Sequence, residues 1–123
     1  MADGFKILAQ ATLTNTEATI YTVPTPSGER FLTRGNSQAV ISSIILCCTN
    51  DAGGAGPNYS IRVKKSGEDA DADKQIIFKE QAIALNETDV LSLGIGLVSG
   101  DSIEAACSSG DAVQMNIFGT EVL

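Results

Sequence analysis

The sequence contains no histidine and no tryptophan, and it has only three cysteines and two tyrosines among 123 residues. Histidine is the usual general base near pH 7 and the commonest transition-metal ligand, so its absence removes the Ser-His and Cys-His nucleophile pairs. The chain also lacks a P-loop, a G-x-S-x-G segment and a Cys-x-x-Cys spacing for zinc. We therefore predict a protein that is not an enzyme and has no catalytic residues, cofactor or metal.

Long apolar runs and a surplus of positive charge are missing as well. No apolar stretch approaches the roughly 20 residues that span a bilayer, and the N-terminus MADGFKILAQ lacks the basic-then-apolar order of a signal peptide. The net charge is −7, whereas a nucleic-acid binder needs a positive surface to displace counterions from phosphates. We expect a soluble protein, made in a cytoplasm, that binds neither nucleic acid nor membrane.

The three cysteines are Cys47, Cys48 and Cys107. Cys47 and Cys48 are adjacent, so on a strand their side chains point to opposite faces. An odd number of cysteines in a chain without a secretion signal indicates buried free thiols rather than a disulfide framework.

Short apolar segments separated by turn-forming residues fill the chain, and almost none of it has helical periodicity. Apolar segments bounded by Gly, Pro, Asn, Asp and Ser are typical of strands. We predict about eight strands, near 5–13, 18–23, 38–49, 58–65, 75–80, 88–93, 101–108 and 112–122. Closely spaced strands in a chain of this length predict an all-β fold, a single-domain antiparallel β-sandwich over residues 1–123, of which the jelly roll is one form.

The segment AVISSIILCCTN differs from the other predicted strands because both of its faces are apolar. Strict alternation places Val40, Ile44 and Leu46 on one face and Ile41, Ile45 and Cys47 on the other. Such a strand is covered twice, either by its own loops at the centre of the sandwich or by another subunit.

Three glycines, Gly94, Gly96 and Gly100, form a near miss of the dinucleotide-binding fingerprint in LSLGIGLVSGDSIEA. The fingerprint needs a third glycine at position 99, where Ser99 stands, and a helix beginning there. The following residues instead alternate as in a strand. We therefore interpret the three glycines as bend and turn residues.

The acidic segment EDADADKQIIFKE places Asp69, Asp71, Asp73 and Glu80 at positions 1, 3, 5 and 12 of a calcium-binding loop. Lys74 stands where that loop requires glycine, and the flanking residues read as strands rather than helices. The pattern favours a solvated hairpin loop over a calcium site.

The order of the segments resembles small all-β virion structural proteins of tailed bacteriophages, particularly those that infect cyanobacteria and other aquatic bacteria. The resemblance covers most of the chain, and its most specific parts are KILAQ…TIYTVP, ALNETDVLSLGIGLVSGD and NIFGTEV. The long PTPSGERFLTRGNSQ and NDAGGAGPN loops and the acidic EDADAD segment depart from it as insertions.

The resemblance implies a capsid decoration or cement protein, located in the virion, that binds the major capsid protein or another virion protein. A neck, tail or fibre component and a carbohydrate- or receptor-binding module remain alternatives. We expect residues 1–10, as an N-terminal docking arm, and the loops at 24–37 and 50–58 to reach the partner. With strand 40–48 and an acidic C-terminal half, the resemblance also predicts a homo-oligomer, a trimer ahead of a dimer.

Overall fold

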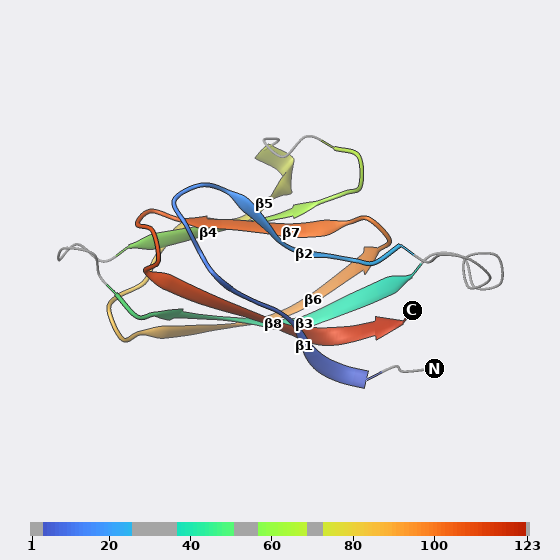
Figure 1. Cartoon of the computed structure of the whole chain (residues 1–123), viewed down its shortest axis with the longest axis horizontal. Coiled ribbons are helices and arrows are strands. Elements are labelled where there is room, and N and C mark those ends of the chain that lie inside the picture. Colours follow the sequence, from blue (N-terminus) through green and yellow to red (C-terminus); the bar gives the residue numbers. More distant parts are fainter. Residues whose placement is uncertain (1–3, 26–36, 51–56, 69–72, 123) are drawn as a thin grey trace.

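The computed structural model describes residues 4–25, 37–50, 57–68 and 73–122, and within them the chain is a β-sandwich of two layers (Figure 1). The strands are β1 (Gly4–Thr12), β2 (Ala18–Thr22), β3 (Gln38–Cys48), β4 (Asn58–Lys64), β5 (Ile76–Ala82), β6 (Thr88–Val98), β7 (Ser102–Cys107) and β8 (Val113–Val122). One 3₁₀ turn, η1 (Asp73–Gln75), precedes β5. The all-β fold predicted from turn chemistry and alternation is confirmed, and each predicted strand overlaps an observed one.

Each layer is a four-stranded antiparallel sheet. Sheet A has the strand order β1-β8-β3-β6, and sheet B has the order β2-β7-β4-β5. The first two strands of the chain pair with the last two, β1 with β8 and β2 with β7. The strands from the middle of the chain pair as β3 with β6 and β4 with β5. This nested pairing is the strand order of a jelly roll.

The core lies between the sheets and follows from the period of two along each strand. In β8 the inward positions are buried from Val113 to Glu121, while the residues between them are partly exposed. The same alternation in β3 and β4 buries Leu46, Tyr59 and Ile61 completely. Burial of such apolar side chains is the main favourable term that holds the two sheets together.

A bulge in β3 changes which of its side chains face the core. Pairing with both neighbours shifts between Ile41 and Ser43. Against β8, Ser42 is an extra residue on β3, whereas against β6 the extra residue is on β6, where Leu93 and Gly94 lie opposite Ser42. Ile41 and Ile44 are therefore both buried, whereas Val40 points outward and is 53% exposed. The expectation that Val40 shares a face with Ile44 is wrong, because strict alternation does not continue through a bulge.

The prediction that Gly94 and Gly96 are bend and turn residues is also wrong. Gly94 and Gly96 lie inside the strand and not in a turn, and neither has a positive φ. The inward positions continue through them from Leu93 to Leu97, because both glycines occupy outward positions of the alternation. Only Gly100, with a φ of 87°, takes the predicted turn conformation that favours glycine.

The segment predicted as an N-terminal docking arm is described from Gly4 onward. From Gly4 to Gln10 it belongs to β1 and pairs along β8, so it forms an edge strand of sheet A. Of the predicted contact loops, residues 26–36 and 51–56 lie outside the described part of the chain. In the described ranges, no helix has the length and apolar character needed to cross a membrane.

Candidate binding face

The outer surface of sheet A consists of side chains that alternate with the core residues of four strands. Register and burial place on it Phe5, Ile7, Gln10 and Thr12 of β1; Gln114, Asn116, Phe118, Thr120 and Val122 of β8; Gln38, Val40, Ser43, Ile45 and Cys47 of β3; and Thr88, Val90, Ser92, Gly94, Gly96 and Val98 of β6. None of these residues is charged, although charged residues make up 19% of the chain. We call this surface the uncharged face.

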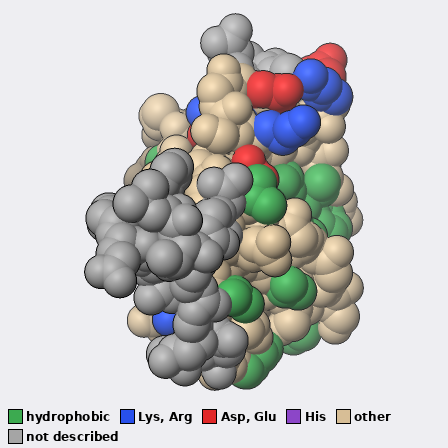
Figure 2. Space-filling view, turned by 90° about the vertical axis from the view of Figure 1, so that its right-hand side faces the viewer, with side chains coloured by type: hydrophobic (Ala, Val, Ile, Leu, Met, Phe, Trp, Pro, Cys, Tyr) green, Lys and Arg blue, Asp and Glu red, His purple; other side chains and the backbone are tan. Residues whose placement is uncertain are grey.

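Several large apolar side chains of the uncharged face are open to solvent. Phe5 is 66% exposed, Val90 62% and Ile7 51%. Figure 2 views one end of the sandwich, where hydrophobic side chains gather in the lower part, on the side of sheet A, and most visible charged side chains lie near the top. Phe5 and Ile7 belong to the edge strand β1 and Val90 to the opposite edge strand β6, so these exposed apolar side chains are spread across the whole width of the sheet.

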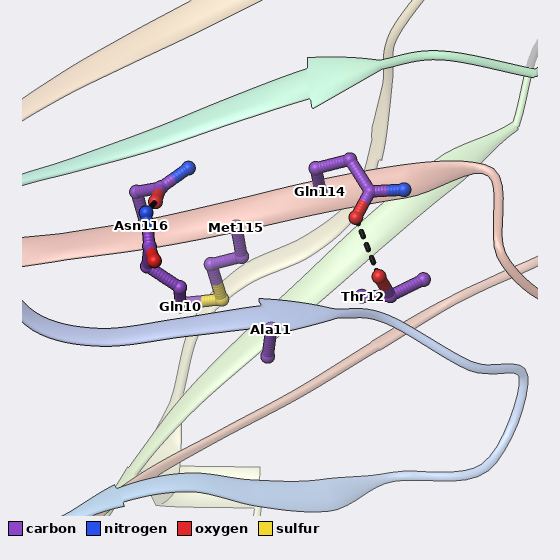
Figure 3. A pocket seen from close by; sticks show the side chains of 6 residues that line it. All are labelled: Gln10, Ala11, Thr12, Gln114, Met115 and Asn116. Carbon is purple, nitrogen blue, oxygen red and sulfur yellow. Dashed lines mark hydrogen bonds between the residues drawn. The ribbon is translucent and has the colours of Figure 1, made fainter.

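Near one end of the uncharged face, β1 and β8 carry a ladder of amides (Figure 3). Gln10 Nε2 donates to Asn116 Oδ1 at 2.7 Å, and Thr12 Oγ1 donates to Gln114 Oε1 at 2.6 Å. Gln114 Nε2 in turn donates to Thr49 Oγ1 at 3.3 Å. Gln10, Thr12, Gln114 and Asn116 line a shallow, open depression between β1 and β8. Ile45 of β3 and Val90 of β6 share a register row with Gln10 and Asn116, so this end of the face is hydrogen-bonding on β1 and β8 and apolar on β3 and β6.

The charged residues of sheet A lie on its other side. Within the four strands of this sheet the charged residues are Lys6, Asp89 and Glu121, and each occupies an inward position. Lys6 Nζ lies 2.9 Å from Glu121 Oε1. The two carboxylates accept hydrogen bonds from Tyr21 and Tyr59 of sheet B, so polar links join the sheets at two places.

The link between Tyr21 and Glu121 perturbs both groups. Burial, followed by the hydrogen bond and negative charge of Glu121, raises the pKa of the Tyr21 hydroxyl well above its usual value. Burial alone would raise the pKa of Glu121, but hydrogen bonds from Tyr21 and Lys6 outweigh it and lower that pKa. The native state therefore favours an ionised glutamate beside a neutral tyrosine.

Tyr59 forms the second link, from a position that is completely buried. Its hydroxyl donates to Asp89 Oδ2 at 2.8 Å. Burial and then the hydrogen bond and charge of Asp89 raise the pKa of Tyr59. The hydroxyl groups of both tyrosines thus form hydrogen bonds between the two sheets, which gives these residues a structural role.

The outer surface of sheet B is built differently, from charged and hydroxyl side chains in contact. Arg62 Nε lies 2.7 Å from Glu17 Oε2, and Lys64 Nζ lies 3.6 Å from Glu104 Oε2. Thr19 Oγ1 donates to the same oxygen of Glu104 at 3.2 Å. This surface contains ion pairs within the chain, whereas the outer face of sheet A has no charged side chain.

The calcium pattern falls partly outside the described residues, since Asp69 and Asp71 are not among them. Asp73 lies in η1, and Glu80 lies in β5, where its backbone N–H donates to Ser60 Oγ. In the part of the chain that the structure describes, no group of three or more Cys, Asp or Glu side chains is placed to hold a metal ion.

The cysteines are free, as predicted. Cys48 and Cys107 are buried, and Cys107 Sγ contacts the Ser109 carbonyl oxygen at 2.7 Å. Cys47 is only half-buried, because it points to the uncharged face while Cys48 points to the core. The prediction of burial is therefore confirmed for two thiols and wrong for Cys47.

Sequence reasoning identified strand 40–48 but missed most of the uncharged face. The signal was present in TDVLSLGIGLV, where leucine and isoleucine alternate with serine and glycine from Leu91 to Leu97. Interpreting Gly94 and Gly96 as turn residues ended the strand too early and hid this pattern.

Comparison of the chain with protein-family models and with curated proteins finds no match.

Proposed function

We propose that this chain is a non-enzymatic structural protein of a phage particle, a decoration protein that binds the outside of the assembled capsid. The observation that carries the proposal is the combination of a jelly-roll sandwich with a broad, exposed, uncharged outer face. Such a face suits contact with another protein, because no charge must be removed from water when it is covered. The sequence resemblance to phage virion proteins supports the same role.

The fold is consistent with this role at the level of analogy. Jelly rolls occur in viral capsid and lectin domains, and a fold alone does not specify a function. The two tyrosine–carboxylate links and the paired charges of sheet B tie the sandwich together. A rigid domain of this kind loses little conformational entropy when it docks on a surface.

The mechanism would be mechanical rather than chemical. A protein that binds the assembled shell, and not its separate subunits, shifts the assembly equilibrium towards the shell by its binding free energy. Many copies acting together, or as an oligomer, turn a weak contact into strong attachment. The partner would be the major capsid protein or another virion protein.

The experiment is to locate the chain on the particle. Antibodies against the purified protein, applied to intact virions of the phage that encodes it, should label the capsid surface in electron micrographs. The purified protein should also sediment with expanded shells and raise the temperature at which they rupture. Labelling of the neck, tail or fibres would replace the decoration role with one of those locations, and absence from the particle would contradict a virion role altogether.

A carbohydrate-binding role is the second candidate, and the depression between β1 and β8 favours it. The amides of Gln10, Gln114 and Asn116 can exchange hydrogen bonds with sugar hydroxyls. Shallow sugar sites usually also present an aromatic ring, and Phe118 is the next outward-facing residue after Asn116 on β8. Binding to a glycan array that is lost in Asn116→Ala would support this candidate, and shell binding without glycan binding would remove it.

A further inference from the structure

We propose that the uncharged face is a self-association interface that binds the same face of a second copy of this chain. The inference rests on the described surface alone and does not depend on the role in a phage particle.

The charge distribution argues for a second copy. Each chain has a net charge of −7, so two copies repel one another wherever their charged surfaces approach. Across the uncharged face no carboxylate or ammonium group must be desolvated, and no like charges are brought together. A strongly basic partner would find no carboxylate on this face to pair with, so an uncharged surface is the better complement. The identical face of another copy is such a surface.

The arrangement of groups on the face is compatible with its own two-fold copy. One end contains Phe5, Ile7 and Val40. The other contains the hydrogen-bonded amides of Gln10 and Asn116 on β1 and β8, with Ile45 and Val90 beside them on β3 and β6.

A two-fold axis within the interface, parallel to the strands, puts each end of the face on the same end of the other copy. In this arrangement β1 faces β6 of the other copy, and β8 faces β3. Phe5 then lies opposite Gly96, and the hydrogen-bonded amides of Gln10 and Asn116 lie opposite Val90 and Ile45. Two such sheets can pack face to face, as the layers of a sandwich do.

The size of the face is sufficient for a stable pair. Four strands about 4.8 Å apart, each about ten residues long at about 3.3 Å per residue, span roughly 600 Å². Two copies would then bury roughly 1,200 Å² in total, which is at the lower bound of specific protein interfaces. We expect a dimer that dissociates on dilution rather than an obligate one.

This symmetry revises the oligomer expected from the sequence. A trimer needs a contact between two different surfaces of the chain, whereas a face that binds itself closes with two copies. The uncharged face therefore places a dimer ahead of a trimer.

The test compares two single-charge substitutions on the face with a matched one on the other sheet. Val40→Glu and Val90→Glu introduce a carboxylate at outward positions that are 53% and 62% exposed, so the fold should remain intact. Ile77→Glu is the control, because Ile77 is also β-branched, is 41% exposed and lies on β5 of sheet B. All three variants change the net charge by the same amount. Circular dichroism and thermal unfolding check that each variant folds.

Analytical ultracentrifugation over a range of protein concentrations provides the readout. The wild type and Ile77→Glu should dimerise with the same dissociation constant. Each Glu substitution on the face should weaken dimerisation about a hundredfold or more, because the two-fold axis brings in two carboxylates at once. Added salt should strengthen the wild-type dimer, since it screens the repulsion between acidic copies and breaks no ion pair in the interface.

Three outcomes would overturn the proposal: a wild-type monomer at the highest concentrations, a trimer, or a dimer that Val40→Glu and Val90→Glu leave intact while Ile77→Glu disrupts it. Val90→Thr, which keeps the side-chain shape and adds no charge, covers the case in which a glutamate variant fails to fold. That variant should dimerise more weakly than wild type and more tightly than Val90→Glu.

Discussion

The two outer faces of the sandwich share strand geometry but differ in their chemistry. On sheet B, Arg62 pairs with Glu17 and Lys64 with Glu104, and of these four side chains only Glu104 is buried. On sheet A, the charged residues Lys6, Asp89 and Glu121 all point between the sheets, and the outer face has none.

The difference is informative because β alternation allows either arrangement. A strand with one wet face normally places polar or charged residues outward, as β4 does with Arg62 and Lys64. Sheet A instead turns its few charges inward, where Tyr21 and Tyr59 hold two of them. This arrangement leaves sheet A with an outer face that another protein can cover without removing any charge from water.

The largest expected effect comes from comparing the same substitution at an inward and at an outward position of β3. Ile44 is completely buried in the core, and its neighbour Ile45 is half-buried on the uncharged face. Ile44→Asp should cost about 4 kcal/mol or more, because an unpaired carboxylate is forced into the core. Ile45→Asp should leave a folded monomer and abolish the dimer. Urea denaturation followed by circular dichroism measures the first effect, and ultracentrifugation the second.

Ile44→Val and Ile45→Val are the controls for this pair, and each should cost about 1 kcal/mol or less. Equal losses of stability in the two aspartate variants would mean that both faces of β3 are core. The distinction between an inner and an outer face would then fail.

A methyl group added to a glycine distinguishes the two sides of sheet A by packing alone. A Cβ on Gly119 of β8 would overlap the Val40 carbonyl oxygen of β3, whereas a Cβ on Gly96 of β6 meets nothing within 4 Å. Gly119→Ala should cost about 3 kcal/mol, since a backbone atom must move to make room. Gly96→Ala should change stability by about 0.5 kcal/mol or less. Thermal and urea unfolding of the two variants give both numbers, and a harmless Gly119→Ala would contradict the register of β8 on β3.

Alternation and turn chemistry were sufficient to predict the strands and the all-β class. They failed at two places that decide the binding face. The bulge at Ser42 has no local signature, because it depends on how β3 pairs with β6 and β8. Gly94 and Gly96 look like turn residues in isolation, and only the continued burial of their neighbours shows that the strand runs through them.

The hydrogen bonds between the two sheets could not be predicted from the sequence either. Tyr21 and Glu121 are 100 residues apart, and neither belongs to a motif. Their contact follows from the jelly-roll order, which puts β2 and β8 in facing sheets. The absence of charge from one face is likewise a property of four strands taken together, so it becomes visible only once their register is known.

The inward charges of sheet A should make stability depend on pH. The pKa of Glu121 is lowered in the native state, so its contribution is present above the ordinary glutamate pKa and is lost as the pH falls through the native value. The urea midpoint should fall on acidification below about pH 5, and more steeply in the wild type than in Glu121→Gln. Tyr21→Phe should cost about 1–3 kcal/mol, because Glu121 loses a hydrogen bond in a buried position.

The tyrosines give the matching test at high pH. Their pKa values are raised in the native state, so their contribution is present below the ordinary tyrosine pKa and is lost as the pH rises above it. With two tyrosines and no tryptophan in the chain, ultraviolet absorbance follows both cleanly. Native protein at about pH 11 should show little tyrosinate, and protein unfolded in urea at the same pH should show both ionised. Early ionisation in the native protein would contradict the buried links.

The smallest effect, on reactivity rather than stability, compares adjacent thiols on the two sides of β3. Cys47 is half-buried on the uncharged face, whereas Cys48 is completely buried and Cys107 nearly so. In dilute native protein, a thiol reagent should modify Cys47 first and reach the other two only through unfolding, because thiolate attack requires access. Cys47→Ser should abolish the fast phase and leave the fold unchanged. Since a second copy would cover this thiol, modification of Cys47 should also slow as protein concentration rises, and it should not slow in Val90→Glu. A rate that is the same at every concentration in dimeric wild-type protein would place the dimer contact away from the uncharged face.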